Sequence, residues 1–166
     1  TKISSKIDGL ITVAALSGYW RLMARPARYL HFMAWYLIAP LTIKLYGYWP
    51  GWAGMKADTS AALGLDFAHW AKKPGFIFDE PRINATEHAN RFLGHLHLFQ
   101  IADDNWGTPA AVKAVHDRYP NAKTRAIEVV EPKDHGIPFI GHFNFFRSAH
   151  RNTLWALALK RLNEFD

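Results

Sequence analysis

The stretch from His95 to Val112 constrains the possible fold more than any other part of this chain. An apolar run from Leu96 to Ala102 stops at two adjacent carboxylates, Asp103 and Asp104, and Thr108-Pro109 then begins a helical pattern. Threonine can cap the first amides of a helix, and proline suits the first helical position because it has no N–H to satisfy. The pattern predicts a buried strand, an acidic turn and a helix.

The two carboxylates have alternative interpretations. In open α/β sheets, ligands bind beyond the carboxyl ends of such strands, so an acid at this point is placed for chemistry. In the other interpretation, one aspartate caps the turn and its neighbour is solvated. This stretch alone leaves both interpretations open.

Two further strands are predicted, at residues 9–16 and 124–130, beside the strand at 95–102. Nearly continuous apolar runs are typical of parallel strands that are covered on both faces. Parallel sheets are usually larger than three strands. We therefore expect an α/β fold, with a mostly parallel sheet and flanking helices, of which this chain supplies the second half.

The predicted organisation has three segments: a core strand at 1–17, a helical cap or lid insertion at 18–90, and the rest of the core at 91–166. A helix is expected from Ser60 to Lys72, before Pro74-Gly75. The segment from Tyr29 to Trp49 is strongly apolar. Its interruptions (His31, Pro40 and Lys44) favour a broken pair of amphipathic helices over a membrane span.

Composition excludes several classes of protein. Apolar residues make up 49% and charged residues 20% of the 166, so the chain is globular rather than disordered. It has no cysteine, which excludes disulfides and thiolate chemistry and fits a cytoplasmic location. The net charge is +6, but the basic residues are scattered, and we expect no nucleic-acid partner.

A histidine follows the last predicted strand, as the acids follow the one before it. Such an order, acid and then histidine after successive strands, resembles the second half of an α/β-hydrolase. The resemblance extends over nearly the whole chain and is nearest to predicted bacterial α/β-hydrolases, serine hydrolases with an aromatic cap. The residues that carry it are Ser17-Gly18-Tyr19-Trp20-Arg21, Asp103-Asp104-Asn105-Trp106 and Ile140-Gly141-His142-Phe143-Asn144-Phe145-Phe146-Arg147.

The resemblance implies hydrolysis of an ester, thioester or amide through an acyl-enzyme. It assigns the acid to Asp104, with Asp103 in reserve, and the base to His142, beside a turn at Gly141. The nucleophile elbow G-x-S-x-G is absent. Ser17 has the right order but lacks the strained strand-turn-helix. The resemblance therefore places the nucleophile before Thr1, in the missing N-terminal half of the same fold, and this chain alone should be inactive.

The resemblance also implies a substrate class. An aromatic cap suggests a small molecule with an apolar acyl or alkyl group, and no cofactor or metal is expected. The residues expected to contact it are Tyr19, Trp20, Trp35, Trp106 and Phe143. With part of the sheet missing, the strand at 9–16 would have an exposed edge, so self-association is expected.

Alternatives remain for the histidines and for the function. His142 could be structural, and His135 precedes the position that the family pattern favours. His95 and His97 share a strand face and could bind a metal with His88, although packed, hydrogen-bonded histidines are the favoured interpretation. The alternative function is a non-catalytic binding or membrane-surface module, with the segment from Tyr19 to Trp52 at a lipid interface.

Overall fold

The computed structural model describes residues 6–54 and 57–165, and the chain divides into two compact units. One unit combines Thr1–Ser17 with Asn84–Asp166, and the other is the insertion Gly18–Ile83. They are called here the sheet unit and the helical unit.

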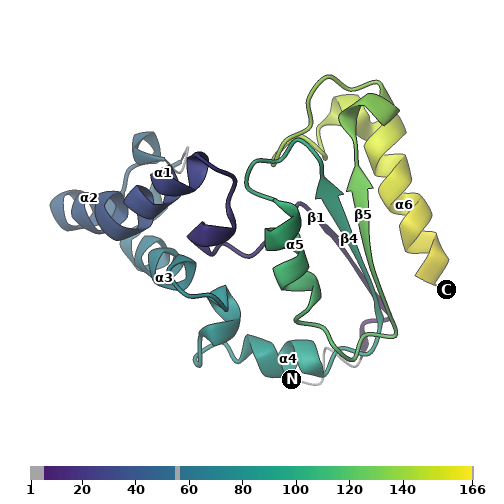
Figure 1. Ribbon diagram of the computed structural model, residues 1–166, viewed down its shortest axis with the longest axis horizontal. Coiled ribbons are helices and arrows are strands. Elements are labelled where there is room, and N and C mark those ends of the chain that lie inside the picture. Colours follow the sequence, from purple (N-terminus) through teal and green to yellow (C-terminus); the bar gives the residue numbers. More distant parts are fainter. Residues whose placement is uncertain (1–5, 55–56, 166) are drawn as a thin grey trace. The chain divides into compact units, whose positions relative to one another are not determined.

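The sheet unit contains three parallel strands in the order β1-β4-β5 (Figure 1). They are β1 (Gly9–Val13), β4 (His95–Ile101) and β5 (Thr124–Val130). The mixed α/β class and the parallel sheet are therefore confirmed. The first strand is three residues shorter than predicted, because Ala14 takes a φ of +52° that ends the extended backbone.

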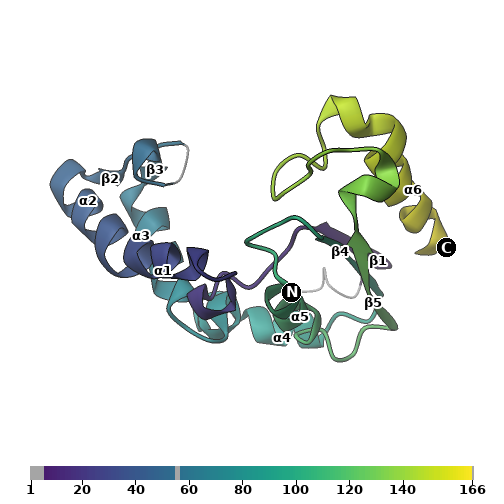
Figure 2. The same ribbon diagram turned by 45° about the horizontal axis from the view of Figure 1, so that its top comes forward.

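Both faces of this sheet are covered (Figure 2). Leu96 and Leu98 pack with Val112 of α5 (Pro109–His116) on one face. Phe99 and Ile101 pack with Leu154 on the other face, where α6 (Ala156–Leu162) lies. Successive side chains of a strand point to opposite faces of the sheet. A strand that is apolar at both odd and even positions therefore needs an apolar layer on each face.

The predicted cap of α5 is present, since the Thr108 hydroxyl accepts a hydrogen bond from the Ala111 amide at 3.2 Å. This helix ends at His116, four residues before Pro120. The remaining helical elements of the sheet unit are α4 (Ala85–Asn90), 3-10 turns at Pro132–His135, Ser148–His150 and Asn163–Phe165, and a π turn at Arg151–Trp155 that leads into α6.

The insertion ends at Ile83, seven residues before the predicted boundary at residue 90. The reason is that α4 and the residues after it pack with the sheet. Ala89 is buried, and Phe92 joins Leu96 and Val112 in one apolar cluster.

The helical unit contains α1 (Ala27–Met33), α2 (Ala39–Tyr46) and α3 (Ala61–Ala71). A two-stranded antiparallel ribbon joins β2 (Tyr48–Trp49) to β3 (Thr59–Ser60), and 3-10 turns lie at Trp20–Leu22, Gly51–Ala53 and Phe76–Asp79. The predicted helix at 60–72 is confirmed, with the Ser60 hydroxyl as its N-cap acceptor.

The pair of helices predicted for this apolar segment is present as α1 and α2, but it is not broken. A π turn at Ala34–Ile38 joins α1 to α2, so the backbone is helical without interruption from Ala27 to Tyr46. In this turn the Ala39 amide donates to the Ala34 carbonyl, five residues back, just before the proline that has no N–H to donate. Across the described residues, no helix is both long and apolar enough to cross a membrane.

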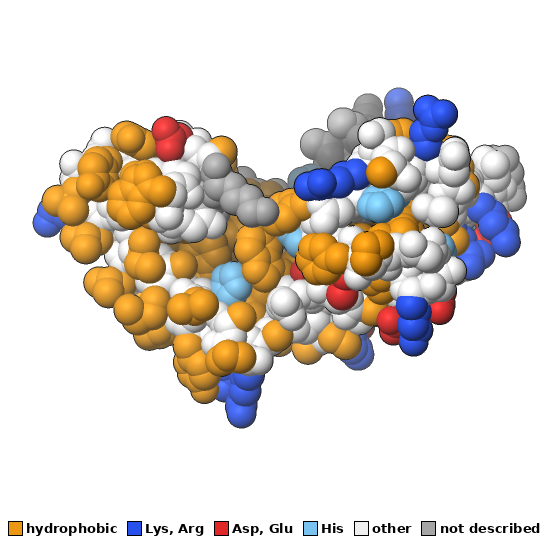
Figure 3. Space-filling view, turned by 90° about the horizontal axis from the view of Figure 1, so that it is seen from above, with side chains coloured by type: hydrophobic (Ala, Val, Ile, Leu, Met, Phe, Trp, Pro, Cys, Tyr) orange, Lys and Arg blue, Asp and Glu red, His pale blue; other side chains and the backbone are white. Residues whose placement is uncertain are grey.

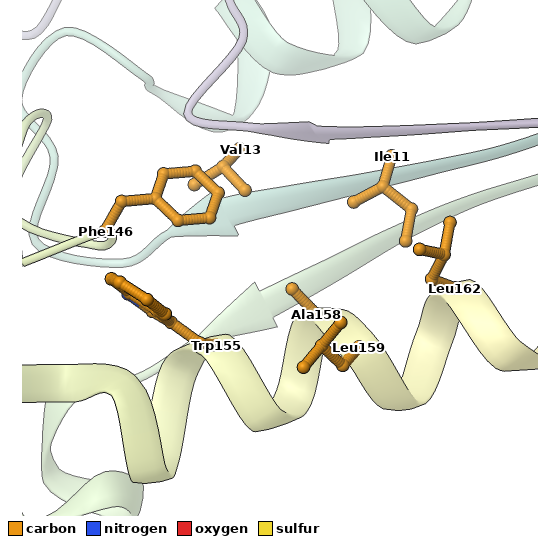
Figure 4. Close-up of a pocket in the computed structure, with 7 residues that line it drawn as sticks. All are labelled: Ile11, Val13, Phe146, Trp155, Ala158, Leu159 and Leu162. Carbon is orange, nitrogen blue, oxygen red and sulfur yellow. The ribbon is translucent and has the colours of Figure 1, made fainter. Parts of the chain in front are cut away.

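An apolar groove of about 560 Å³ lies between β1 and α6 (Figure 4). Ile11 and Val13 of β1 point toward α6, and the lining residues are Ile11, Val13, Phe146, Trp155, Ala158, Leu159 and Leu162. Among the described strands, only β4 pairs with β1. The strand carries no charged side chain that would discourage a further strand from pairing there.

We predict that the isolated chain self-associates through the unpaired edge of β1 and the groove beside it. Leu159→Glu places a carboxylate in the groove and should shift the protein toward monomer, because burying that charge against a partner is unfavourable. Sedimentation velocity over a range of concentrations measures the effect. Leu93→Glu is the matched control, since Leu93 and Leu159 are 62% and 59% exposed. A wild-type chain that sediments as a monomer of 18.9 kDa at every concentration would contradict the prediction.

Candidate active site

The carboxyl ends of β4 and β5 meet at one edge of the sheet (Figure 1). The loop after β4 contains Asp103 and Asp104, and the loop after β5 contains Gly141 and His142. Because adjacent parallel strands lie about 5 Å apart, side chains on loops that leave neighbouring strands can reach each other.

Asp104 and His142 are joined by a hydrogen bond at this edge. The Asp104 Oδ2 atom lies 2.8 Å from Nδ1 of His142. The Asp104 side chain is 2% exposed and the imidazole is 23% exposed. The contact predicted from the order of the two residues along the chain is present. With Nδ1 held by a carboxylate, Nε2 is the ring nitrogen available to exchange a proton with another group.

The Asp104 carboxylate also accepts hydrogen bonds from backbone amides of the turn that follows it. Its Oδ1 atom accepts a hydrogen bond from the Trp106 amide at 2.8 Å, and the Gly107 amide also donates to the carboxylate. Burial by itself raises the pKa of Asp104, but the hydrogen bonds from His142 and the two amides outweigh it, so the pKa lies below its ordinary value. The carboxylate is therefore ionised at neutral pH and is fixed in orientation from both sides.

Asp103 is bound to the backbone of the histidine loop. Its Oδ2 accepts from the Ile140 amide at 2.9 Å and its Oδ1 from the Gly141 amide at 2.8 Å. The carboxylate thus fixes the two residues that immediately precede His142. These contacts give Asp103 a positioning role, whereas Asp104 is the residue that reaches the imidazole.

The turn before His142 depends on its glycine and on a buried anchor. Gly141 has a φ of +55°, and a Cβ at this position would lie 2.4 Å from the Phe139 ring. Ile140 is fully buried in the same apolar cluster as Phe99 and Phe145. The turn is thereby held between the core on one side and the Asp103 carboxylate on the other.

Two aromatic rings pack against the imidazole of His142. The His142 ring centroid lies 4.9 Å from that of Trp106 and 4.7 Å from that of Phe143, and the two aromatic rings are 5.6 Å apart. Phe143 is 58% exposed. These contacts bring together two of the five residues expected to bind substrate and restrict the ring orientation of the histidine.

The other three residues of that expected set lie in the helical unit. Trp35 is 6% exposed and packs against Trp49 and Phe67 in the core of that unit, so its position is explained by folding. Tyr19 and Trp20 are partly buried beside each other. Ser17 belongs to the sheet unit and is 5% exposed, which does not suit an attacking hydroxyl.

The strand histidines have structural partners. His95 Nδ1 lies 2.9 Å from the Thr124 hydroxyl, and His97 Nε2 lies 2.9 Å from Glu128, which also binds Arg161. The interpretation of packed, hydrogen-bonded histidines is confirmed. His88 is a residue of α4, and His135 belongs to the turn after β5. Within residues 6–54 and 57–165, no cluster of three or more metal-ligating side chains occurs.

Comparison with known proteins adds no relative: no family model, curated protein or solved structure matches this chain.

The 2.8 Å contact predicts the tautomer of His142. In the neutral ring the proton should reside on Nδ1, where Asp104 accepts it, and Nε2 should be unprotonated. Nitrogen-15 NMR distinguishes the two ring nitrogens, and His142→Gln identifies the signals. His135 serves as the internal comparison. A neutral His142 protonated on Nε2 would show that Asp104 does not hold the ring in this way.

The lowered pKa of Asp104 also predicts a pH dependence of stability. Because the folded-state pKa lies below the ordinary value of 3.8, the ionised carboxylate stabilises the fold above that value, and this contribution is lost as pH falls through the folded pKa. Asp104→Asn should therefore lower the melting temperature near neutral pH, and the difference from wild type should shrink in acid. Thermal melts followed by circular dichroism measure it, with Asp134→Asn as an exposed control. A difference that is constant with pH would contradict the prediction.

Proposed function

We propose that this chain carries the acid and base of a serine hydrolase of the α/β-hydrolase type. The observation that supports the proposal best is the 2.8 Å hydrogen bond between buried Asp104 and partly exposed His142 at the carboxyl edge of a parallel sheet. Ligands of open α/β sheets bind at this edge, and catalytic histidines are commonly oriented by a carboxylate.

In the proposed reaction, Nε2 of His142 accepts the proton of an attacking hydroxyl and later donates it to the leaving group. Asp104 holds the ring through Nδ1 and stabilises the imidazolium that forms, without taking the proton itself. Asp103 keeps the histidine loop in place through the amides of Ile140 and Gly141. The base is thus oriented before a substrate arrives, which lowers the cost of reorganisation during the reaction.

The proposed nucleophile is a serine on a polypeptide segment outside these 166 residues. None of the chain's five serines lies in a G-x-S-x-G context, and buried Ser17 is a poor candidate. The proposed substrate is an ester, thioester or amide with an apolar acyl or alkyl group. Support for this class comes from Trp106 and Phe143, whose apolar rings lie beside the imidazole.

The test compares the activity of the 166-residue chain alone with that of a longer protein that also contains the proposed N-terminal half of the fold. The 166-residue chain alone should neither hydrolyse p-nitrophenyl esters nor react with a fluorophosphonate probe, and the longer protein should do both. In the longer protein, His142→Ala should abolish turnover. Asp104→Asn should lower kcat by on the order of 10⁴-fold, as in the serine-protease precedent, because the amide leaves the imidazole in the wrong tautomer.

Asp103→Asn should reduce activity much less than Asp104→Asn, because the imidazole keeps its carboxylate. Asp134→Asn, in the turn after β5, is the control for loss of an exposed acid outside the pair. Full activity in His142→Ala would contradict the assignment of the base. Labelling of Ser17 in the isolated chain would instead place the nucleophile within these residues.

A further inference from the structure

One face of the helical run from Ala27 to Tyr46 is apolar and exposed. Its large side chains are 43% to 73% exposed, and successive members are one to four residues apart in the sequence. This exposed stripe consists of Tyr29, Leu30, Met33, Tyr36, Leu37, Leu41 and Leu45. The opposite face, with Trp35, Ala39 and Ile43, is buried in the core of the helical unit. The helix is therefore apolar on both sides, although its own unit covers only one.

Exposed aromatic residues continue the stripe beyond the end of α2. Tyr46 lies 6.3 Å from Tyr48 and 6.1 Å from Trp52, measured between ring centroids, and Trp52 is 75% exposed. Figure 3 shows apolar side chains gathered over the surface of the helical unit. Contiguous apolar surface of this kind marks an interaction site, and tyrosine and tryptophan are enriched where lipid meets water.

The positive charge of this region favours an anionic partner. No aspartate or glutamate occurs between Asp8 and Asp58, whereas five basic residues do: Arg21, Arg25, Arg28, Lys44 and Lys56. Lys72 adds an ammonium 4.7 Å from the centre of the Tyr36 ring. Two acids of the same unit, Asp66 and Glu80, are bound by Arg82. A second copy of the chain would bring cations against cations, whereas an anionic surface would attract them.

We propose that the exposed stripe binds the surface of an anionic lipid bilayer. The helix would lie in the plane of the interface, with the stripe among the acyl chains and Tyr46, Tyr48 and Trp52 at headgroup depth. Arg25 and Lys44, both exposed, would contact lipid phosphates. Apolar burial and attraction to anionic headgroups together are what binds interfacial helices of this kind. The inference does not depend on the proposed hydrolase function, because its readout is binding.

The test is flotation of the 166-residue chain with vesicles of phosphatidylcholine alone or of phosphatidylcholine and phosphatidylglycerol in equal parts. Binding to the anionic vesicles should be at least about tenfold tighter and should weaken with added salt. The double variant Leu30→Ser/Leu45→Ser should reduce binding by about tenfold or more. Leu63→Ser/Leu93→Ser is the matched control, since these leucines are 53% and 62% exposed and lie outside the stripe.

A second pair of variants isolates the charge. The variant Arg25→Gln/Lys44→Gln should weaken binding markedly. The control Lys133→Gln/Lys160→Gln removes the same number of exposed cations and should weaken it little. Absence of binding to anionic vesicles at low salt, by a chain with an intact circular dichroism spectrum, would overturn the proposal. Equal binding to both vesicle types would also overturn it. Self-association lost in Leu30→Ser/Leu45→Ser, without lipid binding, would instead identify a second copy as the partner.

Discussion

Two adjacent carboxylates at the end of β4 hold together the loops from which the candidate site is built. Asp104 binds the imidazole of His142, and Asp103 binds the two backbone amides before it. Their partners are 37 and 38 residues away in sequence. Asp104 is buried and Asp103 is partly buried. A carboxylate removed from water is costly unless its acceptors are filled, so each aspartate gains most when the histidine loop is in its folded position. The loop and the acids therefore stabilise one another.

This arrangement depends on the parallel sheet beneath it. The pairing of β4 with β5 places the ends of both strands at one edge, and the apolar layers on the two faces hold the strands in register. Ile140 anchors the histidine loop in one of those layers. The geometry of the site thus follows from burial of apolar side chains, and the hydrogen bonds at the edge select its final orientation.

The helical unit is distinct in chemistry as well as in fold. Residues 18–83 contain eight Lys and Arg against four Asp and Glu, so most of the net charge of +6 belongs to this segment. The same unit carries the exposed stripe, while the sheet unit carries the Asp104–His142 pair. The proposed lipid contact and the proposed hydrolysis therefore use different residues, and substitutions can separate the two.

Local features of the sequence determined the strands at β4 and β5, the Thr108 cap, the helix that begins after Ser60, and the order of acid and histidine. Each depends on residues within a few positions of one another, where apolar periodicity and capping chemistry are decisive. Only the tertiary structure determined which aspartate reaches His142, because the two acids are adjacent in the sequence and the local pattern does not distinguish them. It also determined the hydrogen-bond partners of the strand histidines, Thr124 for His95 and Glu128 for His97. In the helical unit it determined that Trp35 is buried while Tyr36 and Leu37 are exposed. Those outcomes depend on contacts between segments distant in sequence, and local patterns do not specify them.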